Sequence, residues 1–191
     1  HDTATGAGFG IGGAKGVTGG RKGYKGALFE GGIGVPFIAR WPGKIAAGKV
    51  DGSSLISAVD LLPTFCEIAG AELPSDYKPD GLSQVETLRG KTKTKREKPL
   101  FWKMDASWPA QKSRQNHWVA YAVVDQNWKM VTNHNSSHIE LYNISGDPFE
   151  KTDLKEAQSA VVARMSKQLT AWKATLPDGP DKSCFSKERS Q

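Results

Sequence analysis

The sequence of 191 residues is short of the features that identify several large classes of protein. It has only two cysteines, Cys66 and Cys184, too few for the disulfide framework of a small secreted domain. No apolar run approaches the roughly 20 residues that a membrane-spanning helix needs. The glycine-rich opening lacks the Gly-Lys-Ser/Thr of a P-loop, and no predicted strand precedes it, as a dinucleotide fingerprint requires. These absences argue against a membrane helix, a disulfide scaffold and a nucleotide-binding loop.

The chain does contain enough apolar material for a core, with 38% hydrophobic residues and six tryptophans. Its formal net charge of +6 is carried mostly by one basic run at residues 89–98. Such runs usually form solvated faces, so a solvated linker is the favoured interpretation. Docking of a sulfated polysaccharide is an alternative. Because the rest of the chain is nearly neutral, we expect no nucleic-acid partner.

The most informative segment runs from Lys22 to Gly43. Lys22 and Lys25 stand among glycines, and Glu30 precedes a Gly-Gly turn. The apolar run Val35–Ala39 predicts a buried strand that the following Pro-Gly turn closes. A cation on such a loop can hold an anion, because glycine lets the backbone approach a ligand closely.

Periodicity predicts one helix in the first half of the chain. Asp60 is expected as its N-cap, Pro63 falls in its first turn, and Gly70 suits its C-terminal end. The apolar stripe of this helix comprises Val59, Leu62, Phe65 and Ala69.

The second half predicts a small antiparallel sheet and a final helix. Strands are expected at Leu100–Trp102, His117–Val124, Trp128–Thr132 and His138–Tyr142, with a hairpin loop at Asp125–Asn127. The helix follows a capping-box pattern at Asp153–Glu156 and ends before Pro177. Its stripe, expected to pack on the sheet, comprises Val161, Met165, Gln168/Leu169, Trp172 and Leu176.

Several of these segments match the landmarks of one enzyme family in the right order. Lys22–Gly43 is similar to K-G-x-x-x-E-G-G-x-R-x-P, and Ser57–Gly70 is similar to a "DLxPT…LAG" helix. Later landmarks are Asp80–Ser83, Leu88–Gly90, Leu100–Trp102, Asn127–Lys129, Leu141–Asn143 and Asp147–Glu150. On these residues the chain resembles the type I sulfatases, arylsulfatase-like members of the alkaline phosphatase superfamily, over residues 20–176. The resemblance implies an α/β, alkaline-phosphatase-like sulfatase fold.

Because that family is much larger, we expect this chain to be the C-terminal portion of a sulfatase. Residues 1–75 would then end the large α/β domain, and residues 76–99 would form a basic linker. Residues 100–176 would form a small C-terminal α+β subdomain, an antiparallel sheet with a packed helix, and residues 177–191 would form a tail.

The resemblance implies hydrolysis of a sulfate monoester by a formylglycine nucleophile. Relatives make this group from the first residue of C/S-x-P-x-R, and here the nearest match, Ser107-Trp-Pro-Ala-Gln111, ends in glutamine. The nucleophile is therefore expected in the N-terminal part, and this segment alone is expected to be inactive.

Lys25 falls on the family lysine that contacts the sulfate, and its ammonium can share a proton with the leaving oxygen. Lys22 or Arg21 would add a supporting charge, and the sequence does not choose between them. Glu30 is expected to be structural, either tying the glycine turn or pairing with Lys25. Gly34 departs from the family, which usually has arginine there.

The resemblance also implies one divalent metal, usually Ca²⁺, held by oxygen ligands. These ligands are expected mostly outside this segment, although Asp2 lies at about the right distance before the lysine. His1 is expected to be a loop residue. His117, His134 and His138 lack the partners of a zinc site and are expected to be turn and strand residues.

By resemblance, the protein is expected to be periplasmic or secreted and to act on a sulfated small molecule or sulfated glycan. Two alternatives stay open. One is a phosphoesterase or phosphonate hydrolase of the same superfamily, and the other is a non-catalytic module that binds anions or glycans.

Overall fold

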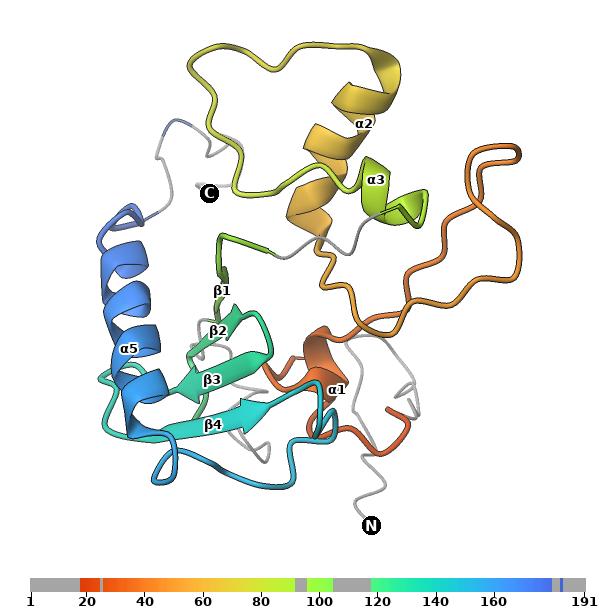
Figure 1. The fold of residues 1–191 in the computed structure, drawn as a ribbon. Coiled ribbons are helices and arrows are strands. Elements are labelled where there is room, and N and C mark those ends of the chain that lie inside the picture. Colours follow the sequence, from red (N-terminus) through yellow and green to blue (C-terminus); the bar gives the residue numbers. More distant parts are fainter. Residues whose placement is uncertain (1–17, 25, 92–95, 105–117, 180–182, 184–191) are drawn as a thin grey trace, which may run out of the picture.

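The C-terminal half of the chain forms a four-stranded antiparallel sheet. In the computed structural model, which describes residues 18–24, 26–91, 96–104, 118–179 and 183, the strands are β1 (Leu100–Lys103), β2 (Tyr121–Asp125), β3 (Trp128–Thr132) and β4 (Ile139–Asn143). Their order in the sheet follows their order in the sequence (Figure 1). The predicted antiparallel sheet is confirmed, with β2 beginning at Tyr121.

A tight hairpin joins β2 and β3, as predicted. Asp125 and Trp128 are paired across it, which leaves two residues for the turn. Gln126, the first of these, has a φ of 55°, in the left-handed region that primed hairpin turns use. Asp125 is therefore the last residue of β2 and does not belong to the loop, where it was predicted.

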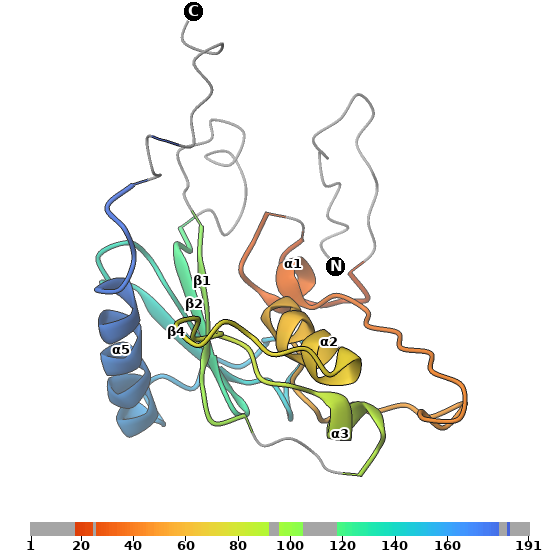
Figure 2. The same ribbon diagram turned by 90° about the horizontal axis from the view of Figure 1, so that it is seen from above.

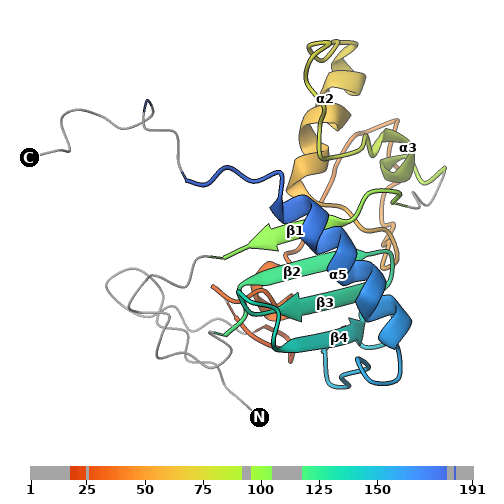
Figure 3. The same ribbon diagram turned by 90° about the vertical axis from the view of Figure 1, so that its left-hand side faces the viewer.

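Helix α5 (Ser159–Lys173) covers one face of this sheet (Figure 3). Met165 and Leu169 are fully buried, and each such side chain stabilises the fold by about 1.5–3 kcal/mol. Their cluster includes Val123, Met130 and Leu141 from the three neighbouring strands. The predicted packing of the helix is confirmed, although the helix ends before Leu176.

The opposite face of the sheet is covered by the start of the described chain. Ala27, Leu28 and Phe29 are buried in one cluster with apolar residues of the sheet, namely Ala122, Val131 and Tyr142. The short helix α1 (Glu30–Ile33) follows directly, and Figure 2 shows it across the sheet from α5. The lysine- and glycine-rich segment therefore packs against the C-terminal sheet.

The predicted helix is α2 (Leu61–Ala69), preceded by the 3-10 turn η1 (Ala58–Asp60). Asp60 is the N-cap, but its carboxylate bonds the N–H groups of Ser57 and Leu82 instead of the first turn of α2. At the other end Gly70 has a φ of 66°, as predicted for a C-terminal glycine. The short helix α3 (Val85–Leu88) follows α2.

The prediction of a buried strand at Val35–Ala39 is wrong. The segment is in no strand, and Val35 and Ile38 are 77% and 92% exposed. A strand that is apolar on both faces needs neighbours to pair with and layers to cover it, and the described residues provide neither. The predicted turn after it is present, because the Lys44 N–H donates to the Trp41 carbonyl oxygen.

The apolar stripe of α2 is also largely uncovered. Val59, Leu62 and Phe65 are 42%, 48% and 59% exposed. Together with Val35, Phe37, Ile38 and Ile68 they make up what we call the apolar surface. Exposed apolar side chains that gather in one patch mark a packing or binding face.

The basic run is not uniformly solvated. Arg96 is buried and forms an ion pair with the fully buried Asp60, while Arg89 and Lys91 both pair with the exposed Glu86. Residues 92–95 lie outside the described part. The interpretation as a solvated linker is therefore wrong for Arg96, because charge patterning in sequence does not reveal a distant buried carboxylate.

No helix in the described ranges is long and apolar enough to cross a membrane.

Candidate functional site

The candidate site is the loop that carries Lys25. Lys25 itself lies outside the described residues, as do His1, Asp2 and His117, so their predicted roles remain predictions. The described part of the site consists of the flanks of Lys25, residues 18–24 and 26–34, and the sheet residues that contact them.

The two glycines after Glu30 allow the loop to lie directly on α1. A Cβ built on Gly31 would lie 2.2 Å from the Gly23 carbonyl oxygen, and one on Gly32 would lie 2.1 Å from that of Ala27. The Gly31 N–H also donates to the Lys22 carbonyl oxygen at 2.7 Å. Any side chain at these positions would push the loop away, so the Gly-Gly pair is a requirement of close backbone packing.

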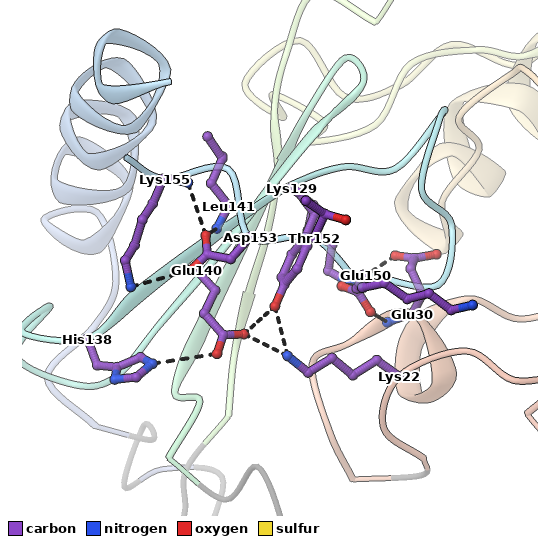
Figure 4. Close-up of polar contacts among 12 residues, drawn as sticks. Lys22, Glu30, Lys129, His138, Glu140, Leu141, Glu150, Thr152, Asp153 and Lys155 are labelled. Carbon is purple, nitrogen blue, oxygen red and sulfur yellow. Dashed lines mark hydrogen bonds and ion pairs between the residues drawn. The ribbon is translucent and has the colours of Figure 1, made fainter. Parts of the chain in front are cut away.

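Glu30 binds to a lysine for which the sequence predicted no role at the site. Lys129, fully buried in β3, places its Nζ 2.8 Å from Glu30 Oε1 and 3.0 Å from Glu150 Oε1 (Figure 4). Glu150 in turn accepts the Glu30 backbone N–H at 2.7 Å. Glu30 thus anchors the glycine turn to the sheet, which is a structural role of the kind predicted, with Lys129 as its partner.

Burial raises the pKa of Glu150, and the nearby Lys129 ammonium opposes that rise. Two carboxylates and one ammonium therefore lie together, with Lys129 and Glu150 fully buried and Glu30 mostly buried. One sequence signal for this cluster was a lysine in the middle of the apolar run Trp128–Thr132, since a lysine is almost never fully buried unless it is paired.

Lys22 is bound to strand β4. Its Nζ donates to Glu140 Oε2 at 2.8 Å and to the Tyr142 hydroxyl at 2.7 Å, and it lies 4.2 Å from the ring centroid of Phe29. Tyr142 donates its own hydroxyl to the same Glu140 oxygen. Figure 4 shows the Lys22 and Glu140 side chains pointing toward each other.

This arrangement keeps Glu140 charged and Tyr142 neutral. Burial acts to raise the pKa of Glu140, but hydrogen bonds from Lys22 and Tyr142 outweigh it and hold that pKa below its ordinary value. Burial and the Glu140 carboxylate raise the pKa of the Tyr142 hydroxyl. Tyr142 therefore stays a hydrogen-bond donor at all working pH values.

His138 extends this network toward the solvent. It lies just before β4, with Nε2 3.6 Å from Glu140 Oε1 and its ring centroid 4.1 Å from that of Trp118. His134 lies in the loop between β3 and β4 and contacts the edge of the Tyr121 ring. Each histidine thus has an aromatic neighbour: Trp118, which precedes β2, for His138, and Tyr121 of β2 for His134.

Arg21 lies beside Gly34. Its Nη1 donates to the Gly34 carbonyl oxygen at 3.3 Å, and the side chain is exposed. A Cβ built on Gly34 would lie 2.7 Å from the Glu30 carbonyl oxygen and 3.4 Å from Arg21 Nη1. Glycine at this position therefore leaves room for the Arg21 guanidinium, whereas an arginine there would require the loop to shift.

The described residues do not fit a metal site. Across the described ranges, no three His, Cys, Asp or Glu side chains are grouped so that they could hold a metal ion. The carboxylates nearest the lysine loop, Glu30, Glu140 and Glu150, are each engaged by a lysine. We therefore assign no chemical step to a metal in this segment.

Comparison with known proteins shows that this chain is similar to a part of longer proteins. The family profile described as N-sulphoglucosamine sulphohydrolase, C-terminal, matches residues 22–175. The chain is 32% identical to a "Sulfatase" of Formosa agariphila over 81% of its length. It is 29% identical to an "N-acetylgalactosamine-6-O-sulfatase" of Bacteroides thetaiotaomicron over 80%. It covers 30% of each of these two relatives.

Its structure resembles that of BT33336S-sulf, from work on the metabolism of multiple glycosaminoglycans by Bacteroides thetaiotaomicron. The TM-score is 0.63 at 28% identity, over 82% of this chain and 32% of that one. The chain thus spans about a third of the length of the proteins it matches. The sheet with its packed helix and the matching profile lead to the same conclusion. This chain belongs to the type I sulfatase family and corresponds to the C-terminal portion of its members.

Proposed function

We propose that the protein containing this chain hydrolyses sulfate monoesters, and that Lys25 binds the sulfate group. The observation that supports the proposal is the fixed backbone on both sides of Lys25. The Gly31–Gly32 turn packs against the backbone of the flanking residues, and buried ion pairs attach these residues to the sheet. A lysine between two flanks that are fixed to the sheet can present its cation to sulfuryl oxygens.

Hydrolysis of a sulfate ester develops negative charge on the leaving oxygen. A donor held in place where charge develops contributes roughly 3 kcal/mol to lowering the barrier. The Lys25 ammonium can stabilise that charge and share a proton with the oxygen. A formylglycine nucleophile and Ca²⁺ belong to the proposed whole enzyme. The described residues supply neither, so no step here depends on them.

For the supporting cation we favour Arg21 over Lys22. The Lys22 ammonium is already shared by Glu140 and Tyr142, whereas the Arg21 guanidinium is exposed and uses one nitrogen for the Gly34 carbonyl. A planar guanidinium also suits the oxygens of a tetrahedral anion.

The proposed substrate is a sulfated sugar or another sulfated small molecule, as the name of the N-acetylgalactosamine-6-O-sulfatase relative suggests. We propose a periplasmic or secreted location because the chain resembles the type I sulfatases, which are often exported. The apolar surface fits a larger protein. Because the matched relatives are about three times as long, we propose that the rest of the sulfatase fold covers it.

The test is Lys25→Ala in the full-length protein, assayed on an aryl sulfate. We expect turnover to fall at least 100-fold, because one placed donor is worth about this much. Lys44→Ala, a lysine in the turn after the Val35–Ala39 segment, serves as the control and should leave turnover unchanged. Aryl phosphate and phosphonate substrates are assayed in parallel. Preferential cleavage of either, or anion binding without turnover, would refute the sulfatase assignment.

A further inference from the structure

We propose that Lys22 is a positioning residue: its side chain fixes the lysine-bearing loop to strand β4 through Glu140 and Tyr142 and does not touch the substrate. This inference rests on the proposed function, because the position being fixed is that of Lys25, three residues further along the chain. It gives two residues of the C-terminal sheet an indirect role in sulfate-ester hydrolysis.

The side chain of Lys22 is held by several contacts at once. Its ammonium donates to Glu140 and to Tyr142 at 2.8 and 2.7 Å and lies against the ring of Phe29 at 4.2 Å. The lysine and glutamate side chains are only 28% and 18% exposed. Ion pairs that are shielded from water and joined by a shared hydroxyl are stronger than exposed pairs.

The main chain of Lys22 is fixed as well. Its carbonyl oxygen accepts the Gly31 N–H at 2.7 Å, which joins the loop to α1. One residue therefore connects three parts of the molecule: the loop, α1 and β4. Three residues of extended chain reach at most about 11 Å, so fixing Lys22 limits where Lys25 can lie.

The far flank of Lys25 has its own anchor. Ala27, Leu28 and Phe29 are buried against the sheet, and Glu30 is bound by the buried Lys129. Without the side-chain contact of Lys22, the near flank would keep the main-chain bond from Gly31 and the Arg21–Gly34 bond but would lose its charged tie to β4. The Lys22 contact therefore supplies the second fixed end that a defined loop position requires.

The same contacts argue that Lys22 does not bind the sulfate itself. A substrate anion would have to draw the ammonium away from Glu140 and leave that carboxylate partly buried without its cation. Removing one partner of a buried pair is unfavourable, whereas the pair as it stands is satisfied. Direct binding and positioning then predict opposite effects for the loss of the Glu140 charge.

The kinetic test compares Lys22→Met, Glu140→Gln and the double variant in the full-length protein on an aryl sulfate. For positioning, each single change lowers kcat about tenfold and alters KM less than twofold, since small misplacements of a reacting group are costly. The kcat of the double variant falls no further than that of the worse single variant, and Lys22→Arg retains most activity.

Direct binding predicts a different result. In that case Glu140→Gln frees the ammonium, so KM and the inhibition constant of inorganic sulfate fall. That result would overturn the proposal.

A second measurement does not depend on activity. In Lys22→Met and Glu140→Gln, hydrogen exchange at the Gly31 amide should become about tenfold faster, because its acceptor is on Lys22. Lys173→Met is the matched control, a lysine that lies over the Tyr121 ring at 4.4 Å and donates to the His134 carbonyl oxygen. It should leave the Gly31 amide unchanged.

These readouts separate the two proposals. Unchanged exchange at Gly31 in both variants overturns the positioning role even in an active sulfatase. Faster exchange in a protein whose turnover survives Lys25→Ala supports the structural tie while refuting the sulfate-binding role of Lys25. Tyr142→Phe, which keeps the ring and removes the shared hydroxyl, should give a smaller change in the same direction.

Discussion

Replacing Lys129 by methionine should strongly destabilise the protein at neutral pH. The change keeps the length of the side chain but removes the ammonium that lies 2.8 Å from Glu30 and 3.0 Å from Glu150. The Lys129 and Glu150 side chains have no exposed surface, and Glu30 is 19% exposed. Two carboxylates would then remain close together without a cation.

The size of the effect follows from the burial of the pair. Removing one partner of a buried ion pair costs about 3–5 kcal/mol of unfolding free energy. For a domain of about this size, each kcal/mol lowers the melting temperature by roughly 2–4 °C. The lower bound of about 3 kcal/mol therefore corresponds to a loss of roughly 6–12 °C.

The pH dependence has a definite sign. Burial already raises the pKa of Glu150 above its ordinary value of 4.5, and the variant loses the charge that opposes this rise. A carboxyl whose pKa is higher in the folded state binds more protons folded than unfolded. Its stabilising contribution is complete below pH 4.5 and is lost as pH rises through the folded pKa. The loss caused by Lys129→Met should therefore be smallest in acid and largest at neutral pH.

Thermal unfolding of the wild type, Lys129→Met and the double variant Lys129→Met/Glu150→Gln between pH 4 and 8 tests this reasoning. The double variant should recover part of the stability at neutral pH, because it removes one of the stranded charges. A Lys129→Met protein that melts within about 2 °C of the wild type, or equally far below it at every pH, would refute the assignment of a buried charge cluster.

Two further changes test the loop and the apolar surface. Gly31→Ala should destabilise the protein by about 1–3 kcal/mol and lower turnover, because its Cβ would meet the Gly23 carbonyl oxygen. Thermal melting and activity are measured. Gly146→Ala is the control, because a Cβ there would have no neighbouring atom within 4 Å. Ile38→Ser should lower the unfolding free energy of the full-length protein by about 1.5–3 kcal/mol and leave that of the 191-residue chain unchanged. An equal loss in both proteins would show that the apolar surface is not covered.

The elements held by local patterns were predictable from the sequence. The period of the stripe through Met165 and Leu169 gave the last helix and its buried face, and a turn-rich gap after β2 gave the hairpin. Gly70 ended its helix because only a residue tolerant of positive φ suits that position. These features depend on residues within a few positions of each other, so a single sequence contains them.

The features that were missed depend on partners far away in the sequence. The buried pair Arg96–Asp60 and the partly buried pair Lys129–Glu30 join residues 36 and 99 positions apart, and the local sequence does not identify the distant partner. The Val35–Ala39 segment failed for a related reason. Its apolar composition suits the cover that we propose from the rest of the whole protein, and in the described part Val35 and Ile38 stay exposed.

The contacts of the lysine loop show why the C-terminal sheet matters to a site that it does not itself form. Lys22 and Glu30 flank Lys25, and each is bound to the sheet through a charge, one at β4 and the other at β3. Apolar packing of Phe29 alone would hold the loop against the sheet, but it would not fix its register, because such contacts are non-directional. Hydrogen-bonded charges on both sides of Lys25 supply that direction. A substitution in β3 or β4 can therefore alter the site without touching a substrate, and catalysis and stability should be coupled through these two strands.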